Sequence, residues 1–294
     1  MEDRAVFPPG TLAVVSTPIG NPGDITLRAL QVLEAADLLA AEDTRTARRL
    51  LSRHGLSRPL VSYHDWNEAQ RAEALLDRLR NGARVALITE AGTPGVSDPG
   101  YDVVRLARER GVPVLPVPGP SALTAFLSVS GLPTNAFSFF GFPPSRPGPR
   151  SALFRRVADR PETLVFYESP RRIVAVLRDA LRILGDRRCA LGREMTKLHE
   201  EFLFGSLGAV LSTLETRPKV LGEICWGVAG VDGSATRAAQ PEEALDRAAR
   251  AILRKDLPLR SSARELAEQF RLPMKDAYRM LSSLRKGGQS VGNK

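Results

Sequence analysis

The 294-residue chain contains few of the residues that build metal sites and disulfide frameworks. It has 2 cysteines, Cys189 and Cys225, and 3 histidines, His54, His64 and His199. The two cysteines have neither the spacing of a metal site nor the density of a disulfide-stabilised fold. Three scattered histidines also argue against a site built from several histidines. We therefore predict no metal centre and two buried, reduced thiols.

Long hydrophobic runs are also missing. The apolar stretches are short and interrupted by charge, Gly or Pro, which predicts no membrane span, and residues 1–10 lack the apolar segment of a signal peptide. Aromatic residues make up only 6% of the chain, whereas 43% hydrophobic and 26% charged residues are ordinary values for a protein with a buried core. We expect a cytoplasmic protein with two domains, or two domains and a small appendage.

Basic residues outnumber acidic residues, and their surplus is unevenly distributed. The formal net charge is +9. Residues 235–294 carry 13 Lys and Arg against 7 Asp and Glu, whereas the preceding residues carry 29 against 26. A basic tail suggests a polyanionic partner, nucleic acid in particular. The alternative is a compositional bias, because arginine greatly outnumbers lysine throughout the chain.

The first part of the chain alternates apolar runs with amphipathic stretches, which is typical of an α/β domain with a largely parallel sheet. The runs predict strands at 12–16, 38–41, 60–64, 85–89 and 114–117. The intervening stretches predict helices at 25–36 with Asp24 as N-cap, within 42–55, at 68–80 and at 103–110.

A second α/β unit is expected from about residue 120 to residue 231. Its predicted helices are 121–130 and 171–184, and PPSRPGPR at 143–150 is interpreted as a loop. Its predicted strands are 137–140, 163–167, 189–194, 200–204 and 223–229. We place the N-terminal α/β domain at 1–118, the second at 119–231, a linker at 232–240 and a small helical domain at 241–294.

The C-terminal part predicts three helices, at 241–254, 261–270 and 274–284. The last two have the proportions of a helix-turn-helix, but a plain helical hairpin used for packing or dimerisation fits equally well. The expected core positions of this pair are Leu266, Phe270, Leu272, Ala277 and Leu281.

Four Gly- and Pro-rich loops stand at the ends of predicted strands or the beginnings of helices. They are TPIGNPGDIT (17–26), EAGTPGVSDPG (90–100), PGPSA (118–122) and YESPRRI (167–173). Glycines permit a close approach of backbone to ligand, and ligands of parallel sheets bind outside the carboxyl ends of the strands. The loops contain neither a dinucleotide fingerprint nor a phosphate loop.

The ordered series STPIGNPGDITLRA, AAEDTR, TEAGTPGVSDPG, VPGPSA, FFGFPP, YESPRRI, GREMTKLHEEFLFG and LGE resembles the motifs of the tetrapyrrole-methylase superfamily over residues 12–230. It is most similar to the branch that methylates a ribose 2′-hydroxyl of a cytidine in small-subunit ribosomal RNA. The sequence departs from the pattern at Glu90, where Asp is usual, and at Leu221, where Lys is usual and Lys219 lies two residues earlier.

The resemblance implies two α/β domains with S-adenosylmethionine in the cleft between them, a small C-terminal helical domain, and a homodimer. The cofactor-binding residues it implies are Pro18, Gly92, Thr93, Val96, Ser121, Ala122 and Tyr167. Two other readings remain open: a methyltransferase acting on a tetrapyrrole or another small molecule, and a non-enzymatic nucleic-acid-binding protein.

Methyl transfer to a ribose hydroxyl requires alignment of the reacting groups and an acceptor for the proton. The candidates for the acceptor are Glu42, Asp43, Asp98, Glu194, Lys197, His199 and Glu200. Phosphate or base edges could be held by Arg45, Arg171, Arg172 and Arg193. We favour Asp43, Arg45, Glu194 and Lys197 as catalytic, although Glu194 and Lys197 could form a structural ion pair.

Overall fold

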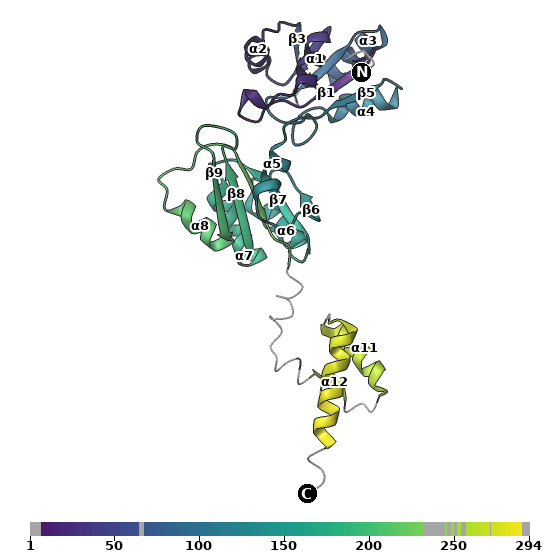
Figure 1. Cartoon of the computed structure of the whole chain (residues 1–294), viewed down its shortest axis with the longest axis vertical. Coiled ribbons are helices and arrows are strands. Elements are labelled where there is room, and N and C mark those ends of the chain that lie inside the picture. Colours follow the sequence, from purple (N-terminus) through teal and green to yellow (C-terminus); the bar gives the residue numbers. More distant parts are fainter. Residues whose placement is uncertain are drawn as a thin grey trace. The chain divides into compact units, whose positions relative to one another are not determined.

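The structure is a computed structural model that describes residues 7–64, 68–231, 245, 248–249, 252–253, 257–270 and 272–289. The chain divides into two compact units, Met1–Gly230 and Val231–Lys294, whose elements are labelled in Figure 1. The predicted linker at 232–240 and most of the helix predicted at 241–254 lie outside the described residues. Within the described ranges, no helix combines the length and apolarity needed to cross a membrane.

The first unit begins with a parallel sheet in the strand order β3-β2-β4-β1-β5. Its strands are β1 Leu12–Val15, β2 Leu38–Ala41, β3 Leu60–Ser62, β4 Val85–Ile88 and β5 Val114–Val117. Strand β1 lies between β4 and β5, with Leu12 opposite Val85 and Val114. Central parallel strands are buried on both faces, which explains the continuous apolar run of β1. The prediction of a parallel sheet is confirmed.

Two pairs of helices cover the two faces of this sheet. The helices are α1 Leu27–Ala35, α2 Thr44–Arg53, α3 Glu68–Arg80 and α4 Tyr101–Glu109. Because successive strand residues point to opposite faces, Ala13 and Val15 belong to the core under α1 and α2. Leu12 belongs to the core under α3 and α4. All five strands therefore present their carboxyl ends, and the loops that follow them, at the same edge of the sheet.

The start of α1 differs from the prediction. Asp24 is not its N-cap but the last residue of a separate 3-10 turn, η1 Pro22–Asp24. The N-cap is Thr26, whose hydroxyl accepts a hydrogen bond from the Ala29 N–H at 3.1 Å. Ile25 is extended, with φ −63° and ψ 136°, so the chain leaves the turn before the helix begins.

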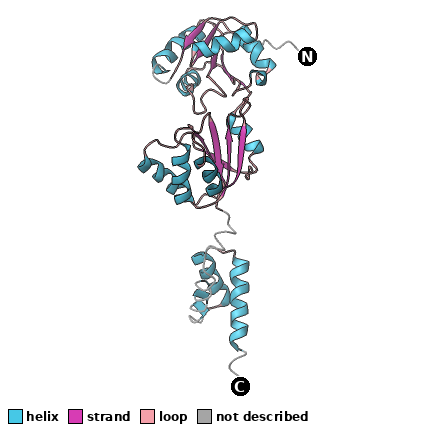
Figure 2. Cartoon of the chain, turned by 90° about the vertical axis from the view of Figure 1, so that its left-hand side faces the viewer, coloured by secondary structure: helices cyan, strands magenta, loops and turns pink. Residues whose placement is uncertain are grey.

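The second sheet of this unit is mixed, in the strand order β6-β7-β10-β8-β9. Its strands are β6 Phe137–Phe139, β7 Thr163–Glu168, β8 Arg188–Arg193, β9 Glu201–Ser206 and β10 Ile224–Val228. Strands β6 and β7 pair in parallel, and the other pairs are antiparallel. Figure 2 shows these strands in magenta beside the helices that cover them.

Residues of β7 alternate between two cores on the faces of the second sheet. Leu164 and Phe166 pack with α6 Pro147–Val157, α7 Ile173–Leu184 and α8 Leu207–Glu215. Val165 and Tyr167 pack with the opposite core, which includes residues of α5 Ala122–Val129. Helix α5 therefore stands between the end of β5 and the face of the second sheet that carries Tyr167.

Helices α6 and α8 are absent from the sequence-based prediction. The interpretation of 143–150 as a loop is wrong for its second half, because α6 begins at Pro147. Proline is tolerated in the first helical turn, where an N–H has no intrahelical partner. Helix α8 could have been predicted from the sequence pattern. Its buried residues have the spacing of one helix face: Leu207, Val210, Leu211 and Leu214.

The described part of the second unit includes α11 Leu259–Phe270 and α12 Met274–Gln289. Leu266, Ala277 and Leu281 are fully buried between them, and Phe270 packs partly against the same cluster. The predicted helical C-terminal domain is thus present. The boundaries proposed at 118–119 and 231–232 stay predictions, as does the choice between a helix-turn-helix and a hairpin.

Candidate functional site

Loops from the ends of three strands are joined by hydrogen bonds. After β1 and β4, the Thr17 N–H donates to the Gly92 carbonyl at 2.8 Å, and the Gly92 N–H donates to the Thr17 carbonyl at 3.0 Å. The hydroxyls of Ser16 and Thr93 lie 2.8 Å apart. The Thr93 hydroxyl also lies 3.4 Å from the carbonyl of Pro120, after β5. Thr93 therefore connects all three loops at the carboxyl edge of the sheet.

These loops line a cavity of about 290 Å³ that extends to the second sheet. Of the seven residues predicted to bind a cofactor, six line it: Gly92, Thr93, Val96, Ser121, Ala122 and Tyr167. The exception is Pro18, which lines a neighbouring cavity, while its neighbour Ile19 lines both. Residues as far apart in the chain as Ile19 and Glu223 thus meet around one space.

The lining contains acidic side chains and no basic side chain. Asp98, Glu168 and Glu223 contribute carboxylates, and the lining residues include no Lys or Arg. The apolar wall includes Phe142 and Met195. Both residues lie in motifs of the ordered series, FFGFPP and GREMTKLHEEFLFG, but were not among the predicted site residues, because side chains that line a cavity by packing have no signature of their own.

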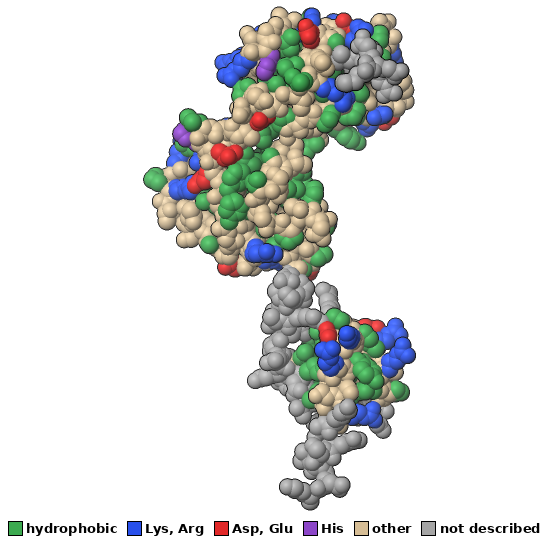
Figure 3. Space-filling model, viewed as in Figure 1, with side chains coloured by type: hydrophobic (Ala, Val, Ile, Leu, Met, Phe, Trp, Pro, Cys, Tyr) green, Lys and Arg blue, Asp and Glu red, His purple; other side chains and the backbone are tan. Residues whose placement is uncertain are grey.

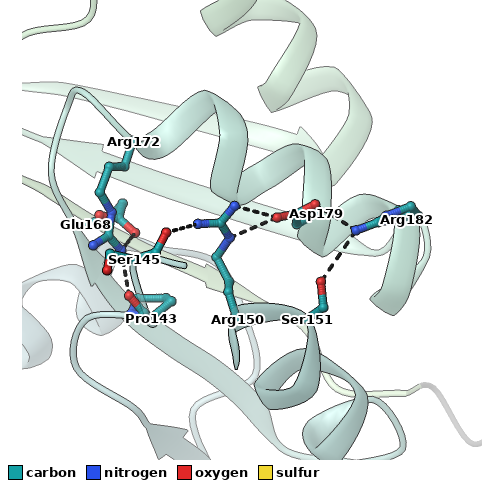
Figure 4. A network of polar contacts seen from close by, with 8 residues as sticks. All are labelled: Pro143, Ser145, Arg150, Ser151, Glu168, Arg172, Asp179 and Arg182. Carbon is teal, nitrogen blue, oxygen red and sulfur yellow. Dashed lines mark hydrogen bonds and ion pairs between the residues drawn. The ribbon is translucent and has the colours of Figure 1, made fainter. Parts of the chain in front are cut away.

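Glu168 is held in place at the end of β7. Its side chain is fully buried and forms an ion pair with Arg172 at 2.8 Å. It also accepts a hydrogen bond from the Ser169 N–H at 2.8 Å. Arg172 donates a second hydrogen bond to the Pro143 carbonyl at 2.5 Å (Figure 4). The same view shows the neighbouring hydrogen bond from Arg150 to Asp179 at 2.6 Å. Arg172, a sequence candidate for phosphate binding, is therefore engaged with a buried carboxylate.

Tyr167 forms an aromatic part of the cavity wall and is not suited to act as an acid or base. Burial raises the pKa of its phenol, and a hydrogen bond with the Leu123 backbone offsets this only in part. Its ring meets those of Phe139 and Phe142 edge to face, with centroids 4.8 and 5.8 Å away. The phenol is therefore neutral at physiological pH.

Glu194 and Lys197 are brought together with Glu223. The Lys197 ammonium donates to Glu194 Oε1 and to Glu223 Oε2, each at 2.9 Å. Burial disfavours both charges, but the bonds between them dominate: the pKa of Lys197 is raised overall and that of Glu194 is lowered. Lys197 is therefore a cation near neutral pH, suited to donate hydrogen bonds and not to accept a proton.

This cluster also contacts the loop that follows β1. The Asn21 N–H donates to the Thr196 hydroxyl at 3.0 Å. A Cβ atom on Gly20 would come within 2.5 Å of Lys197 Cγ and 2.7 Å of Thr196 Oγ1. The glycine in TPIGN is therefore required for the close approach of these two loops.

Asp43 and Arg45 form a separate pair at the start of α2. Asp43 is the N-cap of that helix, accepting from the N–H groups of Arg45 at 2.6 Å and Thr46 at 3.4 Å. The Arg45 guanidinium lies 3.2 Å from Asp43 Oδ2, and its hydrogen bond lowers the pKa of Asp43. No ion pair among the described residues joins this pair to Glu194 and Lys197.

Of the remaining sequence candidates, Arg193 and Glu200 have structural partners, Glu42 accepts from the Glu90 N–H at 3.4 Å, and Arg171 is exposed. Arg193 pairs with Glu201 at 3.0 Å, and Glu200 accepts from the Thr196 N–H at 2.7 Å. His199 is exposed. In the described ranges, no group of three His, Cys, Asp or Glu side chains could hold a metal ion.

Residues 11–211 match the family described as Tetrapyrrole (Corrin/Porphyrin) Methylases. The chain is 40% identical over 281 residues to Ribosomal RNA small subunit methyltransferase I of Synechocystis sp., covering 95% of this chain and 100% of that protein. The protein of the same name from Xylella fastidiosa is 44% identical over 275 residues, with 92% and 98% covered. Uroporphyrin-III C-methyl transferase from Thermus thermophilus, solved with S-adenyl homocysteine, shares the fold with a TM-score of 0.52 and 23% identity, over 74% of this chain and 97% of that chain.

Proposed function

Because the chain belongs to the tetrapyrrole methylase family, we propose that it transfers a methyl group from S-adenosylmethionine to the 2′-hydroxyl of a cytidine ribose in small-subunit ribosomal RNA. The observation that carries the proposal is the acidic cavity, in which six of the seven expected cofactor residues meet. The RNA substrate is inferred from relatives at 40% and 44% identity that align over nearly their whole length.

The cavity fits the cofactor in size and charge. Its volume of about 290 Å³ lies just below the range of about 300–1,000 Å³ that is usual for ligand pockets. S-adenosylmethionine supplies a methyl group on a positively charged sulfonium. The lining has three carboxylates, of which Glu168 and Glu223 are paired with Arg172 and Lys197 outside the lining. A lining without Lys or Arg does not repel a cationic ligand. At the start of α5, the side chain of Ser121 makes no capping bond. The N–H groups of that first turn could therefore receive the cofactor carboxylate.

We assign Gly92, Thr93, Val96, Ser121, Ala122 and Tyr167 to direct cofactor contact, and Pro18 to shaping the loop that carries Ile19. Lys197, held between two carboxylates, would orient the acceptor ribose by donating hydrogen bonds. Glu223 lines both neighbouring cavities, so its carboxylate could accept the hydroxyl proton. Glu194 positions Lys197 and Glu223, and we keep Asp43 and Arg45, at the start of α2, as candidates for a catalytic role.

The C-terminal unit supports an RNA substrate through its charge. Its described helices expose five basic side chains, visible in part as blue atoms in Figure 3: Arg260, Arg264, Lys275, Arg279 and Arg285. Electrostatic attraction to phosphates is independent of sequence and contributes much of the affinity for nucleic acid. We further propose that the protein acts in the cytoplasm as a homodimer, as the family resemblance implies.

The proposal is tested by transfer of a tritiated methyl group to small ribosomal subunits purified from a strain that lacks this protein. We expect label in one cytidine of the small-subunit RNA, resistant to alkaline cleavage on its 3′ side because the 2′-oxygen is blocked. Transfer to a tetrapyrrole instead would favour the small-molecule reading. Absence of transfer together with absence of cofactor binding would favour the non-enzymatic reading.

A matched pair of variants tests the cofactor site itself. Ala122→Leu places a larger side chain in the cavity, whereas Ser128→Leu changes an exposed position of the same helix. Titration calorimetry with S-adenosylhomocysteine should show affinity lowered by at least tenfold for Ala122→Leu and unchanged for Ser128→Leu. Equal affinities would place the cofactor elsewhere.

A further inference from the structure

A second cavity, of about 300 Å³, adjoins the acidic one. The two share Ile19, Ala91 and Glu223 as lining residues. Lys197 also lines the second cavity. A group bound in the second cavity would therefore lie next to a ligand in the first, separated only by side chains that both cavities contact.

Helix α2 forms much of the wall of this second cavity. Thr46, Arg49, Leu50 and Arg53 line it, at the i, i+3, i+4 and i+7 spacing of one helix face. Arg48 is exposed and does not line the cavity. Of the three arginines in TARRLLSR, Arg49 and Arg53 therefore line the cavity and Arg48 does not.

The two cavities differ in the sign of their charges. The first has three carboxylates and no Lys or Arg. The second has Arg49, Arg53 and Lys197 against Glu90 and Glu223. Because Lys197 is already paired with Glu194 and Glu223, the uncompensated positive charge of the second cavity comes from α2.

Arg49 and Arg53 differ from three of the four arginines that the sequence suggested for phosphate binding, and the fourth, Arg171, is exposed but lines neither cavity. Arg45, Arg172 and Arg193 are paired with Asp43, Glu168 and Glu201, respectively. Among the described residues, no ion pair or side-chain hydrogen bond engages Arg49 or Arg53, and both side chains are exposed. Their guanidinium groups are therefore available to an anion from outside the chain.

We propose that Arg49 and Arg53 bind the phosphodiester groups of the RNA strand beside the nucleotide that is methylated. This inference rests on the proposed function and assigns the second cavity to the substrate backbone. The two residues are four positions apart on one helix face, about 6 Å along the axis, which is comparable with the spacing of neighbouring phosphates in one strand. Guanidinium groups bind phosphate oxygens bidentately and stay charged at every physiological pH.

The test is the salt dependence of binding to small ribosomal subunits, measured for Arg49→Ala, Arg53→Ala and the double variant. Arg48→Ala is the matched control, with the same residue type, helix and change in charge. The slope of log affinity against log salt should become shallower by about one for each phosphate contact that is lost. We expect this for each single variant, about twice the effect for the double variant, and no change for Arg48→Ala.

Two further measurements make the outcome decisive. S-adenosylhomocysteine affinity should be unchanged in all variants, which shows an intact fold and an intact first cavity. Arg49→Lys with Arg53→Lys should keep the salt slope, because the charges remain. A double alanine variant with the wild-type slope, or one matched by Arg48→Ala, would overturn the inference. Failure of the proposed function is distinct: the wild-type protein itself would then transfer no methyl group to RNA.

Discussion

A Cβ atom on Gly222 would overlap the side chain of Glu194. Gly222 has φ +90°, and the N–H of the next residue, Glu223, donates to Glu194 Oε1 at 3.0 Å. The glycine thus allows the backbone to close over the carboxylate that holds Lys197. Leu221, which replaces the usual lysine, has a half-exposed side chain and contributes its carbonyl oxygen to Arg193 at 3.0 Å.

Gly222→Ala should destabilise the protein and reduce methyl transfer. The new methyl group meets Glu194, and the positive φ strains any residue other than glycine. We expect the free energy of unfolding, measured with urea, to decrease by about 1–3 kcal/mol. We also expect a lower kcat for methyl transfer. Gly55→Ala is the control, because Gly55 has φ +69° but a Cβ atom added to it would meet nothing within 4 Å. Equal losses in both variants would show that backbone strain alone matters at position 222.

Asp43→Asn should lower the rate of methyl transfer and leave cofactor affinity intact. Asparagine caps a helix about as well as aspartate, so α2 should persist while the charge that pairs with Arg45 is lost. Asp43→Ala removes the cap as well and should lower the melting temperature. Single-turnover rates and thermal unfolding separate the two effects. Unchanged turnover in Asp43→Asn would exclude a catalytic role for this carboxylate.

Glu201 should make stability depend on acid pH. Hydrogen bonds from Arg217, and then from Arg193, outweigh burial and lower the pKa of Glu201 from 4.5 to about 2. Because the folded-state pKa is depressed, the stabilisation is present above about pH 4.5 and is lost as pH falls towards 2. Because the carboxylate is partly exposed, we expect its lowered pKa to contribute on the order of 1–2 kcal/mol to the free energy of unfolding at neutral pH.

The measurement compares wild type with Glu201→Gln by urea unfolding at several pH values between neutrality and acid. The stability difference should shrink as the pH decreases below about 4.5. Glu215→Gln is a suitable control, because it removes a carboxylate whose ion pair with Arg178 is largely exposed. A difference between wild type and Glu201→Gln that does not vary with pH would contradict the assignment.

Deletion of residues 235–294 should weaken RNA binding and flatten its salt dependence. The removed segment carries 13 Lys and Arg against 7 Asp and Glu, and fewer phosphate contacts release fewer counterions. S-adenosylhomocysteine affinity should persist, because every residue that lines the acidic cavity precedes residue 226. A truncated protein with the full salt slope would show that the C-terminal helices serve packing alone.

Local patterns were sufficient for much of the fold. The apolar runs of β1 and β4 and the helix at 68–80 could be located because burial imposes a period that is visible in the sequence. The start of α6 could not, since prolines such as Pro147 and Pro149 occur both in loops and in a first helical turn. The N-cap of α1 was misplaced because Asp24 and Thr26 are both good capping residues, and only the backbone conformation of Ile25 distinguishes them.

The sequence alone determined which loops line the candidate site and which motif series they form, because glycine, proline and capping residues are chosen by local backbone geometry. Only the tertiary structure decided which charges are free to act. Arg193 of β8 is bound to Glu201 of β9, whereas Arg49 of α2 faces a cavity and has no ion pair among the described residues. Ion pairing depends on distances between side chains from separate elements, and those distances exist only once the two sheets and their loops have packed.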